Sequence, residues 1–244
     1  MERLMDAMRD VVFPLYSETD PEESTRTVRD SAGSLVSAFS GNAPEGTAER
    51  IAERLVDAIP RIRDLIAEDV EAISLNDPAV SDEKEILFCY PAVTAMLHYR
   101  TAHVLYEAGA KVLPRMLSER AHSMTGIDIH PAARIGRSFA IDHGTGIVIG
   151  ETAVIGSHVT IYQGVTLGAK NFSHTPDGRP ENLPRHPVLE DGVTVYANAS
   201  ILGRVTIGKG SVIGGNVWLT HSVPEYSRVV QGKMQETFQD GAGI

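Results

Sequence analysis

The spacing of apolar residues along this chain changes near Gly126, from a helical rhythm to a period of six. In "TAERIAERLVDAIPRIRDLIAEDVEAI", apolar residues lie three or four positions apart with charged residues between them: Ile51, Leu55, Ile59, Ile62 and Ile66. This spacing places the apolar side chains on one face of a helix. We expect Pro60 to kink or end that helix, because proline lacks the backbone N–H.

A second stretch, "YPAVTAMLHYRTAHVLYEAGAKVLPRMLSERAHSMTG", predicts a helical hairpin. Gly109 lies where its first helix should end, and Pro114 lies early in its second. Further upstream, Asp77 precedes Pro78, a pair typical of a helix N-cap followed by proline at the first helical position. The Asp77 carboxylate can instead face a ligand. Residues 1–126 are therefore predicted to form an α-helical bundle.

From Ile127 onward, aliphatic residues recur every six positions and glycine often follows them. The positions are Ile129, Ile135 and Ile141, then Ile149, Ile155, Ile161 and Leu167, then Leu189, Val195, Ile201, Ile207, Ile213 and Leu219. A period of six fits neither a helix turn nor strand alternation. It is typical of a short strand and a corner repeated three times per coil. The predicted fold class is α+β: the helical bundle, a parallel β-helix of hexapeptide repeats over 127–224, and a C-terminal tail over 225–244.

Two breaks interrupt the period of six. Ile141 and Ile149 are eight positions apart, and the extra residues fall within "DHGTG". Leu167 and Leu189 are twenty-two positions apart, and the polar, proline-rich segment between them must leave the coil as an extruded loop, 168–188. Because loops on a rigid scaffold commonly carry function, both breaks are candidate sites.

The totals exclude several classes of protein. A net charge of -10 argues against nucleic acid or an anionic membrane as the main partner, because both attract cations. Cys89 is the single cysteine, so no intrachain disulfide is possible and a reducing compartment is expected. A membrane-spanning helix needs about 20 apolar residues, and every apolar run in the chain is much shorter. The start of the chain does not resemble a signal peptide, and we expect a cytoplasmic protein.

His143 is the first candidate for chemistry. Its neighbour Asp142 is badly placed to orient it, because adjacent residues of an extended chain point to opposite faces. Asp128 lies one coil earlier, and stacking should bring it beneath the bulge that holds His143. A carboxylate bonded to one ring nitrogen leaves the other nitrogen free as a base. The alternative is a surface Asp-His pair without function.

Arg185 and His186 in "LPRHPV" are the second candidates. The planar guanidinium of arginine suits a carboxylate. The alternative is a solvated loop that its prolines merely stiffen. No cluster of histidine and cysteine has the spacing of a zinc site, so no metal is expected. Trp218 and Tyr162 are expected on faces of the coil that meet a neighbouring subunit.

Four segments together resemble serine acetyltransferases: "GIDIHPAARIGRSFAIDHGTGIVIGETAVIG", "YQGVTLGA", "RHPVLEDGVTVYANASILG" and "IGKGSVIGGNVW". The resemblance extends from residue 75 to about residue 224. It implies transfer of an acetyl group from acetyl-CoA to the hydroxyl of L-serine, giving O-acetylserine for cysteine synthesis. It also implies a left-handed β-helix in homotrimers that pair, as a dimer of trimers, through the helical domains.

The resemblance also assigns roles to individual residues. His143 corresponds to the family's general base, Asp128 to the residue that orients it, and His186 to a residue beside the reacting hydroxyl. The serine-binding positions it implies are Asp77 and Asp142 for the ammonium group, Arg185 for the carboxylate, and Glu151 in the adjoining G-E-T segment. Because cysteine shares the ammonium and carboxylate of serine, we expect L-cysteine to compete at the same site as an inhibitor.

Further positions follow from the same resemblance. The acetyl-CoA groove is expected along Gly168, Ala169, Ala197 and Gly215. The family has a tail whose last isoleucine, here Ile244, enters the active site of cysteine synthase, and capture of a terminal carboxylate by backbone donors is a known recognition mode. The alternative is a frayed terminus.

Three rival functions stay open at this point. Another hexapeptide O-acetyltransferase, acting on a sugar or other alcohol, would keep the coil but would not need Asp77 together with Arg185. A γ-type carbonic anhydrase would need three metal-binding histidines across a subunit boundary, a spacing that the chain lacks. A non-catalytic regulatory partner of cysteine synthase would need only the tail.

Overall fold

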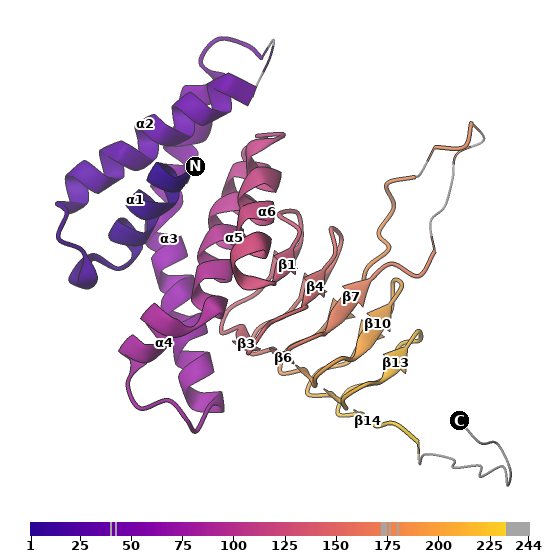
Figure 1. The fold of residues 1–244 in the computed structure, drawn as a ribbon. Coiled ribbons are helices and arrows are strands. Elements are labelled where there is room, and N and C mark those ends of the chain that lie inside the picture. Colours follow the sequence, from indigo (N-terminus) through magenta and orange to yellow (C-terminus); the bar gives the residue numbers. More distant parts are fainter. Residues whose placement is uncertain (40, 42, 172–174, 176, 180, 233–244) are drawn as a thin grey trace, which may run out of the picture.

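A computed structural model describes residues 1–39, 41, 43–171, 175, 177–179 and 181–232. Ile244, predicted to contact cysteine synthase, lies outside the described residues. Helices occupy one end of the described chain and a coil of short parallel strands occupies the other (Figure 1). No helix within the described ranges is both long and apolar enough to cross a membrane.

The predicted helical region is confirmed. Its elements are α1 (Glu2–Val12), the 3-10 helix η1 (Pro14–Tyr16), α2 (Pro21–Phe39), α3 (Thr47–Asn76), α4 (Glu83–Cys89), α5 (Pro91–Glu107) and α6 (Leu113–Thr125). Helix α5 packs against α6 as the predicted hairpin, and α2 packs against α3. The hairpin turn contains Gly109 at a φ of 97°, a left-handed conformation that glycine adopts without a steric penalty.

Two local predictions about α3 need correction. Of the two outcomes expected at Pro60, an end of the helix is wrong: α3 continues to Asn76, because its apolar face stays buried on both sides of the proline and this packing offsets the missing hydrogen bond. Asp77 is not an N-cap: it ends α3, and the next helix, α4, begins six residues later, capped by the Asp82 side chain. A turn separates the two helices, in which the Ala79 N–H donates to Asp77 Oδ1 at 2.8 Å.

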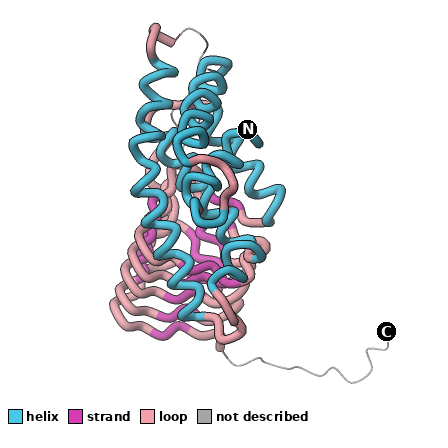
Figure 2. Tube along the Cα trace, turned by 90° about the vertical axis from the view of Figure 1, so that its left-hand side faces the viewer, coloured by secondary structure: helices cyan, strands magenta, loops and turns pink. Residues whose placement is uncertain are grey.

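The coil has three parallel sheets, here called sheets A, B and C in the order in which the chain visits them. Sheet A contains β1 (Asp128–Ile129), β4 (Val148–Ile149), β7 (Thr166–Gly168), β10 (Ser200–Leu202) and β13 (Trp218–Leu219). Sheet B contains β2 (Arg134–Ile135), β5 (Val154–Ile155), β8 (Val188–Leu189) and β11 (Thr206–Ile207). Sheet C contains β3 (Ala140–Asp142), β6 (Thr160–Tyr162), β9 (Thr194–Val195), β12 (Val212–Ile213) and β14 (Arg228–Val229). Figure 2 shows these rungs stacked beneath the helices.

The residues at the period of six fill the inside of this coil. All of them are buried except Ile135, which is half-buried. The predicted hexapeptide-repeat β-helix is therefore confirmed, while its left-handed sense stays a prediction. The coil extends beyond the predicted boundary at residue 224, because β14 pairs with β12 and the Gly214 N–H donates to Val229 O at 2.8 Å. Val223, which pairs with Ile207, and Val229, which pairs with Ile213, are six positions apart and could have revealed this last rung.

A buried ion pair joins the helices to the first coil. Arg100 on α5 donates two hydrogen bonds to the Asp69 carboxylate on α3, at 2.9 and 2.8 Å, and both side chains are only 3% exposed. The remaining contacts reach the coil: Asp69 Oδ1 accepts from the Phe139 N–H at 2.9 Å, and Arg100 also donates to Gly136 O at 3.1 Å. The helical region and the β-helix therefore pack as neighbours around a shared polar contact.

Candidate active site

His143 lies at the corner where the chain passes from sheet C to sheet A. Its φ of 55° is left-handed, which is uncommon for a residue other than glycine and places it outside the regular strand geometry. The side chain is 71% exposed, and its Nε2 lies 3.8 Å from Asp142 Oδ1. The expectation that Asp142 points away from His143 was wrong, because it assumed an extended backbone at a position that is bent.

Asp77 belongs to the same region. Its carboxylate accepts from Tyr90 Oη at 2.6 Å and from the Ala79 N–H, and these bonds, with a smaller effect of the nearby His143, lower the pKa of Asp77. The bond to Asp77 raises the pKa of Tyr90 to about 12, so the phenol stays protonated as a donor. Asp77, Asp142 and His143 form what we call the acidic cluster, and two anions beside an imidazole suit a cationic ammonium group.

Asp128 lies on β1, one coil before His143, and its role in orienting the ring stays a prediction. It pairs with Val148 across β1 and β4, and its N–H donates to Ile147 O at 2.9 Å. Among the described residues, its carboxylate makes no hydrogen bond to His143. The bulge that follows Asp142 turns His143 outward, and the register of β1 with β4 aligns Asp128 with a residue beyond that bulge.

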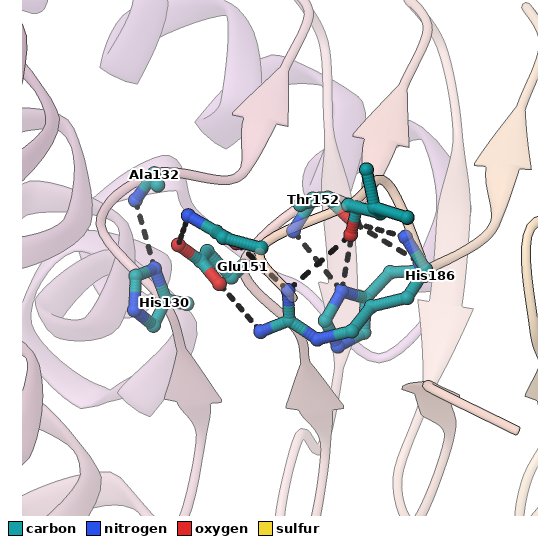
Figure 3. Close-up of polar contacts among 8 residues, drawn as sticks. His130, Ala132, Glu151, Thr152 and His186 are labelled. Carbon is teal, nitrogen blue, oxygen red and sulfur yellow. Dashed lines mark hydrogen bonds and ion pairs between the residues drawn. The ribbon is translucent and has the colours of Figure 1, made fainter. Parts of the chain in front are cut away.

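A second cluster lies at the corner between sheets A and B, where the extruded loop returns to β8. Arg185 donates to Glu151 Oε2 at 2.5 Å, and both side chains are half-buried. Burial alone would raise the pKa of Glu151, but the hydrogen bond and charge of Arg185 outweigh it, so the pKa is lowered. His186 lies beside them (Figure 3). Glu151, Thr152, Arg185 and His186 form what we call the basic cluster.

His186 is held as a neutral ring. Burial, followed by the charge of Arg185, lowers its pKa to about 4. The Thr152 N–H donates to Nδ1 at 3.1 Å, and since a backbone amide can only donate, the neutral ring carries its proton on Nε2. His186 is therefore suited to donate a hydrogen bond from Nε2 at neutral pH rather than to act as the titrating base.

Gly150 leaves the space in which the His186 ring lies. A Cβ on Gly150 would fall 2.0 Å from the ring Cδ2. We therefore expect Gly150→Ala to displace the imidazole and to lower kcat/KM for the reaction at this site by at least tenfold. Gly136 occupies the equivalent place after an isoleucine of the repeat, but its Cβ would meet the backbone oxygen of Gly156 at 2.6 Å. Gly136→Ala should therefore lower the thermal midpoint instead. Equal loss of stability in both variants, measured by circular dichroism, would contradict this assignment.

The predicted cofactor residues divide between the same two corners. Ala197 and Gly215 follow strands of sheet C, and the Asn216 N–H donates to Ala197 O at 2.9 Å, so they stack below the His143 corner. Gly168 and Ala169 lie at the end of β7, at the same corner of the coil as the basic cluster. Each corner thus carries part of the predicted acceptor site and, further along the coil, part of the predicted acetyl-CoA groove.

A cavity of about 310 Å³ adjoins the basic cluster. Its lining includes the cations Lys170, Arg185 and Arg204, which suit an anionic ligand. The Arg204 guanidinium also donates to Thr152 O at 2.7 Å and to His186 O at 3.0 Å. Sequence reasoning missed Thr152 and Arg204, because their partners lie 18 to 52 positions away. No group of three histidine, cysteine or acidic residues within the described chain is arranged to hold a metal ion.

Residues 186–221 match the family described as "Bacterial transferase hexapeptide (six repeats)". Together with the three-sheet coil, this match places the chain in the class of hexapeptide-repeat transferases. "Serine acetyltransferase, plasmid" of Synechococcus elongatus is 44% identical over 267 residues, covering 99% of this chain and 83% of that protein. The chain belongs to the serine acetyltransferase family.

Two solved structures agree with this assignment. Serine acetyltransferase isoform 3 of Entamoeba histolytica, in complex with cysteine, is 33% identical, with a TM-score of 0.86 and coverage of 97% of this chain and 83% of that one. A serine acetyltransferase in complex with CoA is 31% identical, with a TM-score of 0.64 and coverage of 92% and 94%.

Proposed function

We propose that the active site is shared by two neighbouring copies of the chain, one supplying the acidic cluster and the other the basic cluster. As a serine acetyltransferase, the chain transfers the acetyl group of acetyl-CoA to the hydroxyl of L-serine, giving O-acetylserine and CoA. The observation that supports a shared site is the division of the predicted residues between two corners of one coil. The acidic cluster has no cation for the carboxylate of serine, and the one carboxylate of the basic cluster, Glu151, is already paired with Arg185.

His143 is the general base of this proposal. It takes the proton from the serine hydroxyl as the oxygen attacks the thioester carbonyl, and it returns that proton to the departing CoA sulfur. A placed base of this kind contributes about 10²- to 10⁴-fold to the rate. Asp128 orients the ring in the assembled site. The exposed His143 side chain makes no hydrogen bond within the described residues, so it can turn toward that carboxylate.

The two clusters complement the two charges of serine. Asp77 and Asp142 bind the ammonium group. Arg185, which donates one hydrogen bond to Glu151, binds the carboxylate through its guanidinium. His186 donates from Nε2 beside the reacting hydroxyl. Cysteine carries the same two charged groups and inhibits by occupying this site, as the cysteine complex of the Entamoeba histolytica relative supports.

The acetyl-CoA groove runs along the same two corners. Its walls are Gly168, Ala169, Ala197 and Gly215, which are half-buried and carry at most a methyl group. The cationic cavity beside Lys170 and Arg204 suits the phosphates of CoA. The CoA complex of a relative supports this placement.

The assembly we propose is a homotrimer, which pairs into a dimer of trimers through the helical region. Exposed aromatic residues on the coil, among them Trp218 and Tyr196, suit contact between copies. Ile244 binds cysteine synthase, a partner that the family resemblance supports. The protein is located in the cytoplasm, whose reducing conditions suit a chain with Cys89 as its single cysteine.

Complementation between two inactive variants tests the shared site. His143→Ala and Arg185→Leu each remove one cluster, so each alone should be inactive with serine. When the two are co-expressed in equal amounts and assemble at random, each mixed trimer has one site that combines an intact acidic cluster with an intact basic cluster, which makes about a quarter of all sites. We therefore expect CoA release at about a quarter of the wild-type rate. Absence of any recovery in mixed trimers would place the whole site within one chain.

A further inference from the structure

We infer that Thr152 is a positioning residue, whose hydroxyl holds the His186 ring in the tautomer with its proton on Nε2 and fixes the backbone of the Arg185–His186 segment. The consequence for catalysis rests on the proposed function. The placement itself rests on four contacts, each made across 33 or 34 positions of sequence.

Thr152 Oγ1 lies at the centre of these contacts (Figure 3). It accepts from the Arg185 N–H at 2.9 Å and from the His186 N–H at 3.0 Å. It also lies 2.9 Å from His186 Nδ1, the atom to which the Thr152 N–H donates. One threonine therefore contacts the ring and the backbone of the segment that carries both functional side chains.

The direction of each bond follows from the chemistry of the atoms. A hydroxyl oxygen has two lone pairs, and two backbone N–H groups occupy them. The hydroxyl proton is then left to donate to Nδ1, which already accepts from the Thr152 N–H. Two donors aimed at Nδ1 leave no room for a proton there, so the proton of the neutral ring is on Nε2.

Gly150 and Arg204 restrict where the His186 ring can lie. Gly150 provides the space beneath it, where a Cβ would fall 2.1 Å from Nε2. The Arg204 guanidinium donates to the carbonyl oxygens of both Thr152 and His186. With the backbone anchored in this way, the Thr152 hydroxyl and the Thr152 N–H together keep Nδ1 as the acceptor and leave Nε2–H to face a ligand.

Thr152→Val keeps the shape of the side chain and removes the hydroxyl. It leaves two backbone N–H groups without their acceptor and removes one of the two donors to Nδ1. We expect kcat/KM for serine to fall by about 10- to 100-fold, since a lost buried hydrogen bond of this kind costs about one or two factors of ten. Thr152→Ser keeps the hydroxyl and should retain activity within about threefold of wild type. Thr194→Val on β9, whose hydroxyl makes no hydrogen bond among the described residues, is the matched control and should behave as wild type.

The tautomer is measured directly on the wild-type protein. Long-range ¹⁵N–¹H correlation spectra of the imidazoles, with the His186 signals identified by their loss in His186→Asn, should show the proton on Nε2. A proton on Nδ1 would overturn the inference, as would a Thr152→Val enzyme with full activity or a Thr152→Ser enzyme as impaired as Thr152→Val. If wild type does not acetylate serine, the proposed function fails, whereas the spectrum still decides the role of Thr152.

Discussion

His143→Ala is expected to lower kcat for serine acetylation by about 10²- to 10⁴-fold, the contribution of a placed general base. The side chain is 71% exposed, so its truncation leaves no cavity and the fold should be unchanged. The measurement is CoA release at saturating acetyl-CoA and serine, with circular dichroism to check folding.

His158→Ala is the matched control for this variant. His158 also adopts a left-handed φ, of 58°, but at the corner between sheets B and C, beside a different cavity that Glu68 and Glu71 line. It should keep wild-type kcat. Comparable losses in both variants would mean that the bent corners matter for structure rather than for proton transfer.

Two carboxylate variants separate the roles around the same ring. Asp128→Asn should lower kcat with little change in KM, because it removes the orienting group. Asp142→Asn should raise KM for serine, because it removes part of the ammonium site. The opposite pattern would assign the orienting role to Asp142, whose Oδ1 lies 3.8 Å from the ring.

The second large effect is expected from Arg100→Leu, which should lower the free energy of unfolding by about 3–5 kcal/mol. The substitution leaves the Asp69 carboxylate buried without its counter-charge, and removes a link between α3, α5 and the first coil. Arg137→Gln is the control, because Arg137 pairs with the adjacent Glu68 at the surface and should leave the unfolding midpoint nearly unchanged. Urea denaturation of both variants measures the difference.

The same pair gives a pH dependence. Burial raises the pKa of Asp69 from 3.8 to about 6, although Arg100 opposes the shift. Because the folded value lies above the unfolded one, the protonated carboxyl favours the folded chain, and this contribution is lost as pH rises through about 6. Without Arg100 the folded pKa rises further. Arg100→Leu should therefore lose more stability at about pH 8 than at about pH 5, and an equal loss at both values would contradict the pairing.

Local sequence reasoning failed where long-range contacts decide the structure. Proline usually ends a helix, but α3 continues past Pro60 because its buried face is continuous. Asp77 before Pro78 has the pattern of an N-cap, but its carboxylate accepts from Tyr90, which lies between α4 and α5, and His143 of the coil is near it. Thr152 has no distinguishing signal in the sequence, since its partners lie across the extruded loop.

By itself, the sequence determined the helical region, the three-sided coil and the positions of its two breaks. The coil and its breaks follow from the repeat of six, because the repeated residue is the one whose side chain points inward. It also determined the family, through motifs that keep reactive residues at fixed places on that repeat. Only the tertiary structure decided that the acidic and basic clusters lie at different corners, that Asp142 Oδ1 lies 3.8 Å from His143 Nε2, and that burial and Arg185 lower the pKa of His186. Those properties depend on backbone angles at single bends and on hydrogen bonds between distant rungs, which a linear pattern does not encode.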